Sequence, residues 1–291
     1  MSGETRRAIV LGGINGLLGR PLTEALTRTG FAVWPTGRSE FDPCDPVAVD
    51  KALAGYRPTH LFNTVAYTAV DKAEDEPEAA YHLNRDLPAL LATACRRAGV
   101  RFVQYSTDFV FDGKKGSPYR EEDPTHPESV YGASKLAGEE AILNQDLPDC
   151  QILRTAWLYG PGKKNFVTTI LGLARDRAEL PVVADQIGSP TFTLDLAGWS
   201  AELAVTQTSG IIHAAGGGQA SWCELAAEAV AAAKLPCRVL PIPSDAYPQQ
   251  AKRPSYSVLD TGKLARAIGR APRPWREAVR DYVTGLAPSA S

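Results

Sequence analysis

A tyrosine and a lysine stand four residues apart in the segment Tyr131-Gly132-Ala133-Ser134-Lys135. On a helix, which the periodicity of the following residues favours, both side chains share one face with Cβ atoms about 5–6 Å apart. An ammonium about 4 Å from a phenol favours the phenolate by roughly 4 kcal/mol at an effective dielectric near 20, equal to about three pKa units. A tyrosine tuned in this way can give a proton to a carbonyl as hydride arrives. The spacing alone is common by chance, so its meaning depends on the residues that precede it.

Polar side chains also end an apolar run upstream of this pair. Residues 101–106 are typical of a buried strand, and Ser106, Thr107 and Asp108 stand at its end. Ligands of open α/β sheets bind at the carboxyl ends of parallel strands. The alternative is that Ser106 and Thr107 only cap the strand. Together with Tyr131 and Lys135, they favour a catalytic group.

A glycine loop follows the first predicted strand, residues 8–11, and precedes a helix predicted over 17–29. Gly13, Gly16 and Gly19 have the spacing that allows a tight turn, close approach of backbone N–H groups to a pyrophosphate, and close helix–strand packing. The helix N-terminus adds unpaired donors for the anion. A simple glycine-rich turn is the alternative, but the strand before it and the helix after it favour a dinucleotide site.

The residues after the second predicted strand, 31–34, bear on cofactor choice. NAD sites usually carry an acidic residue about 20 residues beyond the glycine loop. Here Thr36, Arg38 and Ser39 offer donors instead, and the guanidinium fork of Arg38 suits a 2′-phosphate. The sequence predicts NADPH. NADH is the alternative, because Glu40 could turn inward, or Arg38 could be a solvated loop charge.

Short apolar runs alternate with helix-length segments along the first half of the chain. Beyond the runs at 8–11, 31–34 and 101–106, strands are predicted over 60–65 and 151–154, and a long helical stretch ends near Gly99. Nearly continuous apolar strands are typical of a parallel sheet covered on both faces. The prediction is an α/β fold, a Rossmann-type doubly wound parallel sheet.

After residue 159 this rhythm loosens. Helical patterns remain over 166–177, 194–205 and 222–234, with a strand over 210–213 and many proline-punctuated segments between them. We expect a cofactor domain mainly in residues 1–159, and a smaller, interwoven C-terminal α/β substrate domain mainly in 160–291. Segments at about 193–216 are expected to return to the first domain.

Composition excludes several classes of protein. The 291 residues hold 31 Lys and Arg against 33 Asp and Glu, so the formal charge of -2 argues against a nucleic-acid partner. No apolar run reaches the roughly 20 residues of a membrane span, and the N-terminus lacks a signal-peptide core. The five cysteines and four histidines form no metal-like spacing. We expect a cytoplasmic protein with reduced thiols and no metal.

Taken together, the glycine loop, the Ser-Thr-Asp strand end and Tyr131-x-x-x-Lys135 resemble the extended short-chain dehydrogenase/reductase family. Longer segments narrow the resemblance to the dTDP-4-dehydrorhamnose reductases within it. These segments are residues 63–74, YSTDFVFDG (105–113), VYGASKLAGE (130–139), RTAWLYG (154–160), DQIGSPT (185–191) and AKRPSYSVLD (251–260).

This resemblance implies reduction of the 4-keto group of dTDP-6-deoxy-L-lyxo-4-hexulose to dTDP-L-rhamnose. Tyr131 would be the proton donor, Lys135 would bind the nicotinamide ribose, and Thr107 would bond the substrate carbonyl beside Asp108. The full set of predicted cofactor contacts is Gly13, Asn15, Gly16, Leu17, Leu18, Gly19, Arg38, Ser39, Cys44, Asp45, Val65, Ala66, Tyr67, Tyr131 and Lys135.

Within that set, Cys44 and Asp45 would hold the adenine, and residues 65–67 would line the cofactor at the third strand. On the sugar side, Trp157 would pack on the hexose, while Asn165 and the basic pair 252–253 would face the nucleotide. The predicted substrate contacts are Val70, Lys72, Thr107, Asp108, Tyr131, Trp157, Asn165, Lys252 and Arg253.

One departure from the family pattern concerns assembly. Family members that dimerise around magnesium carry a glutamate two residues after the glycine loop, and this chain has Pro21 there. Any homodimer is therefore expected to lack that metal bridge.

Two other functions remain open. One is a reductase or epimerase for a different nucleotide sugar. The other is a non-catalytic, cofactor-binding regulatory subunit, similar to the β subunit of methionine adenosyltransferase. The intact set of Thr107, Tyr131 and Lys135 favours an enzyme.

Overall fold

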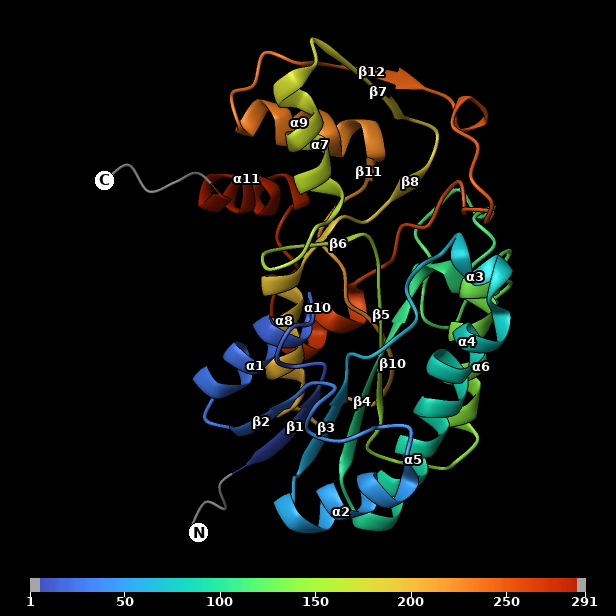
Figure 1. Cartoon of the computed structure of the whole chain (residues 1–291), viewed down its shortest axis with the longest axis vertical. Helices are drawn as coiled ribbons and strands as arrows, with labels where there is room; N and C mark the ends of the chain where they lie inside the picture. The colour runs from blue at the N-terminus through green and yellow to red at the C-terminus, as the bar shows by residue number, and fades with distance from the viewer. Residues whose placement is uncertain (1–5, 287–291) are drawn as a thin grey trace.

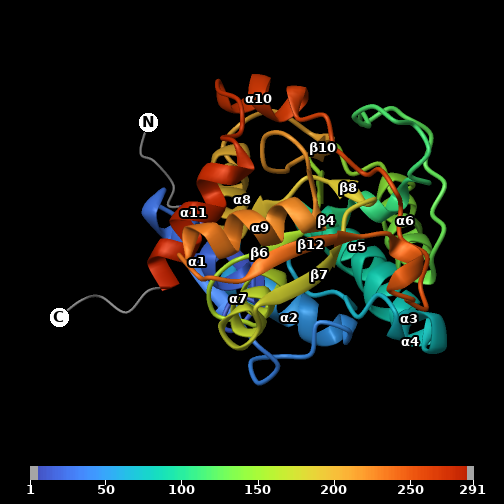
Figure 2. The same cartoon turned by 90° about the horizontal axis from the view of Figure 1, so that it is seen from above.

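The computed structural model describes residues 6–286, and its centre is a six-stranded parallel sheet (Figures 1 and 2). The strand order is β10-β5-β4-β3-β1-β2. The chain moves from β1 out to β2 and then returns to β3 on the other side of β1, which makes a topological switch point where ligands bind. The strands are β1 (Arg7–Leu11), β2 (Ala32–Thr36), β3 (His60–Asn63), β4 (Arg101–Thr107), β5 (Gln151–Thr155) and β10 (Gly210–His213).

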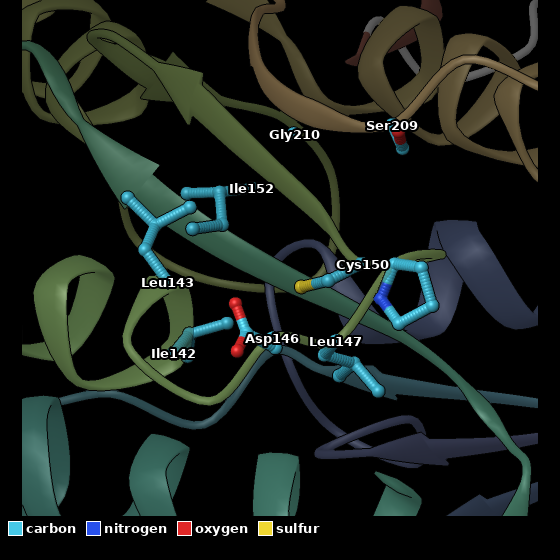
Figure 3. A pocket seen from close by; sticks show the side chains of 9 residues that line it. Ile142, Leu143, Asp146, Leu147, Cys150, Ile152, Ser209 and Gly210 are labelled. Atoms are coloured by element: carbon cyan, nitrogen blue, oxygen red, sulfur yellow. The ribbon is translucent and has the colours of Figure 1, made fainter.

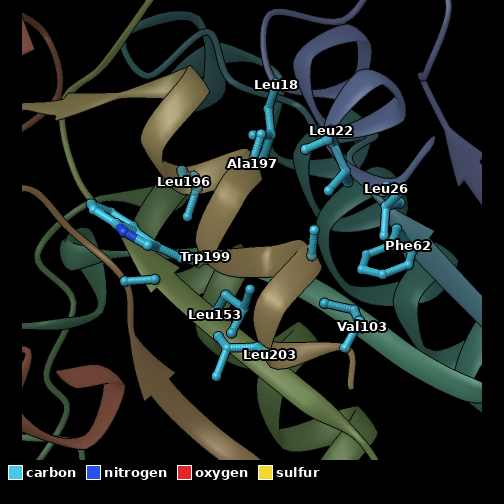
Figure 4. Packing of buried hydrophobic residues seen from close by; sticks show 14 of the residues in the cluster. Leu18, Leu22, Leu26, Phe62, Val103, Leu153, Leu196, Ala197, Trp199 and Leu203 are labelled. Atoms are coloured by element: carbon cyan, nitrogen blue, oxygen red, sulfur yellow. The ribbon is translucent and has the colours of Figure 1, made fainter. Parts of the chain in front are cut away.

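Helices α1 (Gly19–Arg28), α8 (Thr193–Leu203) and α10 (Gly262–Ile268) cover one face of this sheet. Leu22 and Leu26 of α1 pack with Leu196 of α8 over the strand residues that point to this side (Figure 4). Complete burial of each such side chain stabilises the fold by roughly 1.5–3 kcal/mol.

The other face is covered by α2 (Pro46–Tyr56), α5 (Leu87–Ala98) and α6 (Val130–Leu143). Side chains alternate along a strand, so Ala8 and Val10 belong to the first cluster and Ile9 and Leu11 to the second. Because both sets are buried, β1 is apolar throughout. The predicted doubly wound sheet is confirmed.

The long helix predicted before Gly99 is broken into four pieces. These are α3 (Lys72–Asp75), α4 (Pro77–Tyr81), the π-helical turn η1 (His82–Asp86) and α5. Glu76 adopts φ −123° and ψ 53°, outside the helical region, because the ring of the following Pro77 disfavours a helical conformation there.

The C-terminal part builds a second, smaller layer above the carboxyl ends of the sheet strands (Figure 1). Helices α7 (Phe166–Asp176), α9 (Trp222–Ala232) and α11 (Trp275–Leu286) pack there with the parallel pair β7 (Glu179–Val183) and β12 (Arg238–Ile242). Short strands complete it: β6 (Leu158–Tyr159), β8 (Ile187–Gly188), β9 (Thr191–Phe192) and β11 (Ala220–Ser221).

Some late segments belong to the main sheet. Strand β10 pairs with β5, and α8 packs on α1. Helix α10 joins them, which the sequence did not predict. The placing of a domain boundary near residue 159 stays a prediction. Within residues 6–286, none of the helices has both the length and the apolar character that crossing a bilayer demands.

Candidate active site

Thr107 and Asp108 lie where β4 ends and the short 3-10 helix η2 (Asp108–Val110) begins. Both are buried. The Thr107 hydroxyl donates to Asp108 Oδ1 at 3.1 Å, and the Ser257 hydroxyl donates to Oδ2 at 2.6 Å. Burial raises the pKa of Asp108 to about 6, although both hydroxyls oppose this by stabilising the carboxylate.

Ser257 was missed by the sequence analysis, although it lies within the segment 251–260. The C-terminal chain runs beside Ile187, whose N–H donates to Ser255 O and whose carbonyl accepts from Ser257 N. Two of the recognised segments, 185–191 and 251–260, therefore lie side by side. Because these segments pair, the Ser257 hydroxyl lies within hydrogen-bond distance of Asp108.

Tyr131 and Lys135 occupy the first two turns of α6, which begins after Ser129. The Ser129 hydroxyl accepts from Gly132 N at 3.1 Å, a side-chain N-cap. Lys135 is buried, and its Nζ donates to Tyr105 O of β4 at 2.6 Å. Burial lowers the Lys135 pKa to about 8. The lysine is thus anchored to the strand that also carries Thr107.

The pKa of Tyr131 differs from the expectation. Burial raises it to about 12, the Thr107 side chain opposes that rise, and the charge of Asp108 adds to it. The expected lowering by Lys135 is not found, because the ammonium is directed at a β4 carbonyl and the phenolate is poorly solvated. Tyr131 is therefore neutral at physiological pH, the protonation state that a proton donor needs.

Asn84, in the π-helical turn η1, is a second residue that sequence reasoning missed. It is buried, accepts from Tyr67 N at 2.9 Å, and donates to Tyr67 O and to Ser134 Oγ, each at 3.0 Å. One side chain thus connects the loop after β3 to α6 between Tyr131 and Lys135. A π-helical turn often accompanies a functional site, but no local sequence pattern predicted one here.

The glycine loop leads from β1 into α1 with no room for side chains. A Cβ on Gly16 would lie 2.5 Å from the Gly12 carbonyl oxygen, and one on Gly19 would lie 2.1 Å from it. The first turn of α1 has no side-chain N-cap. Its backbone N–H groups and the close turn fit a pyrophosphate. Asn15 is exposed, while Leu17 is partly and Leu18 fully buried.

The loop after β2 lies beside the glycine loop. A Cβ on Gly37 would approach Ile14 Cδ1 to 3.3 Å. Glu40 folds back and accepts from Gly37 N at 2.5 Å and from Ser39 Oγ at 3.0 Å, while Arg38 is exposed. Both an arginine and a carboxylate therefore stand at this end of β2.

The other predicted cofactor residues lie at neighbouring strand ends. Val65, Ala66 and Tyr67 follow β3 and are partly buried. Asp45 caps α2 by accepting from Val47 N at 2.9 Å, and the partly buried Cys44 precedes it. These residues line the same edge of the sheet as the glycine loop.

Trp157 is tightly held on the sugar side. Its ring stacks on Trp222 with centroids 3.5 Å apart and planes 3° apart. A Cβ on Gly188 would lie 2.4 Å from its Cε2 atom, so Gly188 backbone lies against the ring as well. The Trp157 backbone has φ +47°, a left-handed conformation that is strained for a bulky residue. Such strain is often stored at a ligand site.

The charged residues predicted on the sugar side are paired with carboxylates. Arg253 donates to both oxygens of Asp71, at 3.0 and 2.9 Å. Lys252 pairs with Glu128 at 2.9 Å, and Lys72 pairs with Glu76 at 2.7 Å. The first two pairs connect segments far apart in the sequence, whereas Lys72 and Glu76 are four residues apart. Val70, partly buried, directly precedes Asp71.

Asn165 has a structural task in this fold. It caps α7 in a reciprocal capping box with Thr168. Its Nδ2 also contacts Gly160 O at 2.8 Å, Lys163 O at 3.1 Å and Tyr282 OH at 3.0 Å. A substrate contact through this amide would compete with those bonds.

A separate hollow lies at the opposite, amino ends of the sheet strands. It is lined by residues at the end of α6 and the start of β5, among them Ile142, Leu147, Cys150 and Ile152 (Figure 3). None of the predicted site residues lines it.

The doubly wound sheet, the glycine loop, and Thr107 with the Tyr131–Lys135 pair define the class as an extended short-chain dehydrogenase/reductase. The sequence model described as "RmlD substrate binding domain" matches residues 7–287. A dTDP-4-dehydrorhamnose reductase of Streptomyces griseus is 45% identical over 98% of this chain and 96% of its own length. The chain therefore belongs to the RmlD family of dTDP-4-dehydrorhamnose reductases.

Two further relatives refine this assignment. A dTDP-4-dehydrorhamnose reductase of Bacillus anthracis, solved in complex with NADP, has a TM-score of 0.92 at 34% identity, covering 97% of this chain and all of that one. A probable dTDP-4,6-dihydroxy-2-methyloxan-3-one 4-ketoreductase of Streptomyces antibioticus is 42% identical over 92% of each chain.

Proposed function

We propose that this protein reduces the 4-keto group of dTDP-6-deoxy-L-lyxo-4-hexulose to give dTDP-L-rhamnose, using NADPH. The observation that carries the proposal is the meeting of Thr107, Asp108, Tyr131 and Lys135 at the carboxyl end of β4. The name and bound ligand of the B. anthracis relative support the same reaction and cofactor. NADH is the alternative cofactor, because Glu40 lies beside Ser39.

The cofactor fits the residues at the switch point of the sheet. The glycine loop and the start of α1 would hold its pyrophosphate, since that helix start has no side-chain N-cap and the glycines let it pack directly on the Gly12 carbonyl at the end of β1. Reduced nicotinamide supplies hydride, which this reaction requires at C4 of the sugar. Lys135 would hold the ribose, and residues 65–67 would lie along the cofactor.

The chain's own residues supply the proton and the geometry. Tyr131 is neutral and gives its phenolic proton to the oxygen that becomes the C4 hydroxyl. The Thr107 hydroxyl donates to Asp108 Oδ1 in the absence of substrate and would turn its single proton to the same substrate oxygen on binding. The buried Lys135 ammonium then stabilises the tyrosinate that is left. Trp157 and the basic residues 252–253 would face the sugar and its diphosphate.

A coupled assay tests this function. The protein is incubated with dTDP-4-keto-6-deoxyglucose, the 3,5-epimerase and NADPH, and the product is identified by mass spectrometry and NMR. Formation of dTDP-L-rhamnose together with NADPH oxidation supports the proposal. NADPH binding without turnover would instead favour the regulatory-subunit alternative.

A different deoxysugar is the second candidate, because the S. antibioticus relative bears the name of another 4-ketoreductase. Parallel measurement of kcat/KM for the 6-deoxy-hexulose and for a 2,6-dideoxy analogue would separate the two. A preference for the dideoxy substrate would reassign the sugar and keep the chemistry.

A further inference from the structure

A buried ion pair lies one helical turn beyond Lys135. Glu139 and Arg154 are 1% and 3% exposed at their side chains. Arg154 Nε donates to Glu139 Oε1 at 3.0 Å and to Oε2 at 3.2 Å, and its Nη2 donates to Oε2 at 2.6 Å. Glu139 lies in the recognised segment 130–139 and Arg154 in 154–160, but neither residue was among the predicted site residues.

Two features place the Glu139–Arg154 pair close to Lys135: the spacing along α6 and the register between β4 and β5. Tyr131, Lys135 and Glu139 recur at four-residue spacing on α6, so Lys135 and Glu139 share a face. Lys135 reaches Tyr105 O on β4, and Arg154 on β5 is the register partner of Ser106, one residue further along β4. The ammonium and the carboxylate therefore lie over adjacent strands.

The side chains around the pair fix it in place. Arg154 also lies over the Phe111 ring, 5.1 Å from its centroid. The edge of His213 meets the same ring at 5.8 Å, and burial lowers the pKa of His213 to about 3, so this neighbour is uncharged. Glu139 thus has Arg154 as its ion-pair partner and Lys135 as the cation one turn away.

Other charged groups on the elements around α6 are engaged elsewhere. On η1, Arg85 pairs with Asp86 at the surface. Glu74 of α3 accepts from Val130 N, and Asp108 of η2 is bonded to two hydroxyls. On α5, Arg97 pairs with Asp50.

The remaining titratable groups on these elements are exposed or far along the helix. His82 of η1 lies at the surface near Asp86, and Glu78 of α4 and Arg96 of α5 are exposed. Glu139 is the charge that raises the Lys135 pKa against the effect of burial.

We propose that Glu139 is a positioning residue for the reaction: its carboxylate, oriented by Arg154, keeps the buried Lys135 charged and directed toward the active-site strand. A desolvated lysine loses its proton readily, and a neutral amine would neither stabilise the tyrosinate nor serve as a cationic anchor for the ribose. The inference rests on the proposed function for its catalytic meaning, but the charge of Lys135 can be measured without any sugar.

Two substitutions with opposite electrostatic effects test the proposal. Glu139→Gln removes a negative charge near Lys135 and leaves Arg154, whereas Arg154→Gln leaves the carboxylate without its counter-charge. Lys135 is titrated directly by NMR in protein labelled at lysine Cε, with its signal assigned through Lys135→Met. The alkaline midpoint of kcat is measured in parallel.

We expect the Lys135 titration midpoints of Glu139→Gln and Arg154→Gln to differ. A charge about 6 Å away at an effective dielectric near 20 moves a titration by about two pH units. Glu139→Gln should move the Lys135 midpoint toward acid by about one to two units, so that kcat at pH 8 falls about tenfold or more and recovers toward pH 6. Arg154→Gln should have a midpoint at least about one unit above that of Glu139→Gln.

A purely structural role for the pair predicts another outcome. Both variants would then lose stability, but the pH midpoint of the Lys135 titration would be the same in the two variants, or the same as in the parent. Either result would overturn the proposal. If either single variant fails to fold, the double variant Glu139→Gln, Arg154→Met is titrated instead. Its Lys135 midpoint should fall below that of the parent, and an unchanged midpoint would count against the proposal.

A matched control comes from the other face of the sheet. Asp195 on α8 pairs with Arg273 at 2.8 Å and is also partly buried. Asp195→Asn breaks a carboxylate–arginine pair without changing the field at Lys135. Its midpoint should equal the parent's. Because the NMR titration needs no nucleotide sugar, a wrong substrate assignment leaves this test intact.

Discussion

The two sides of the proposed site, one predicted to bind the cofactor and the other the sugar, use their polar groups in opposite ways. On the cofactor side, the start of α1 has no side-chain cap, and Gly16 and Gly19 bring it directly against the Gly12 carbonyl. On the sugar side, the basic residues 252–253 and Lys72 are bonded to carboxylates, and the Asn165 amide is used within the fold. Trp157 stacks on Trp222.

This difference has a physical origin. A backbone turn needs no partner beyond the chain around it, so a pyrophosphate cradle can be built in advance. On the sugar side each basic side chain already has a carboxylate partner, and a diphosphate must compete with those carboxylates. We therefore expect affinity for the cofactor to depend on shape, and affinity for the nucleotide sugar to depend on exchange of ion-pair partners.

The largest expected effect is on turnover, from substitution of Tyr131, which lies between the cofactor side and the sugar side. Tyr131→Phe should lower kcat by about 10²–10⁴-fold, the usual contribution of a general acid, and should leave NADPH affinity unchanged. Stopped-flow turnover and fluorescence titration of NADPH measure these two quantities. Tyr56→Phe, which loses a hydroxyl bonded to Ala32 O at 2.9 Å, is the control with normal turnover. Turnover within tenfold of the parent in Tyr131→Phe would remove the assignment.

The next effect tests the ion pairs of the sugar side. Arg253→Gln should raise KM for the nucleotide sugar about ten- to hundredfold, because a charge-assisted bond of about 1.5–3 kcal/mol is lost and Asp71 is left facing the diphosphate. KM for NADPH should stay the same. Arg270→Gln, which breaks a surface pair with Glu202, is the control. Equal changes in both KM values would contradict the division into two sides.

On the cofactor side, Arg38→Ala should raise KM for NADPH about tenfold and leave KM for NADH unchanged. The arginine is exposed, so the lower end of the range for a charge-assisted bond applies. Arg28→Ala, at the far end of α1, serves as the control. A parent enzyme that prefers NADH, or equal losses for both cofactors, would show that Glu40 rather than Arg38 decides the choice.

A smaller effect is expected from the hydroxyl that joins the C-terminal segment to β4. Ser257 donates to the ionised Asp108 and so lowers its pKa, which burial raises to about 6. Ser257→Ala should raise that pKa further. The acid limb of kcat should then move to higher pH by about one unit, with about a twofold loss at pH 7.

Ser255→Ala is the matched control for that change, since its hydroxyl donates to Gly113 O at 2.9 Å. Its pH profile should follow the parent's. An acid limb that moves to lower pH in Ser257→Ala would mean that the ionised carboxylate is not required.

For the removal of magnesium we expect no effect on activity or assembly. Pro21 is buried in the first turn of α1, and this residue is the basis for the prediction that any homodimer lacks a magnesium bridge. Chelation of magnesium should therefore leave both turnover and the sedimentation coefficient unchanged. Conversion of a dimer to a monomer by a chelator would refute this.

Local pattern was enough to predict the elements that hold the site. The observed strands β1 and β5 begin or end within one residue of their predicted bounds, and α7 ends one residue before the prediction. Strand hydrophobicity, the glycine spacing and the Tyr131–Lys135 spacing are properties of short stretches of chain. The pair β7–β12 was not predicted because Pro181 and Pro241 interrupt their patterns.

The sequence by itself determined the fold class, and it predicted the cradle for the pyrophosphate and the general acid. Only the tertiary structure decided the partners: Ser257 on Asp108 across 149 residues, Arg253 on Asp71 across 182, and Arg154 on Glu139. It also decided the pKa of Tyr131, which burial raises and the Thr107 side chain only partly lowers. Hydrogen bonds and desolvation depend on which distant segments meet, and no spacing along the chain specifies that meeting.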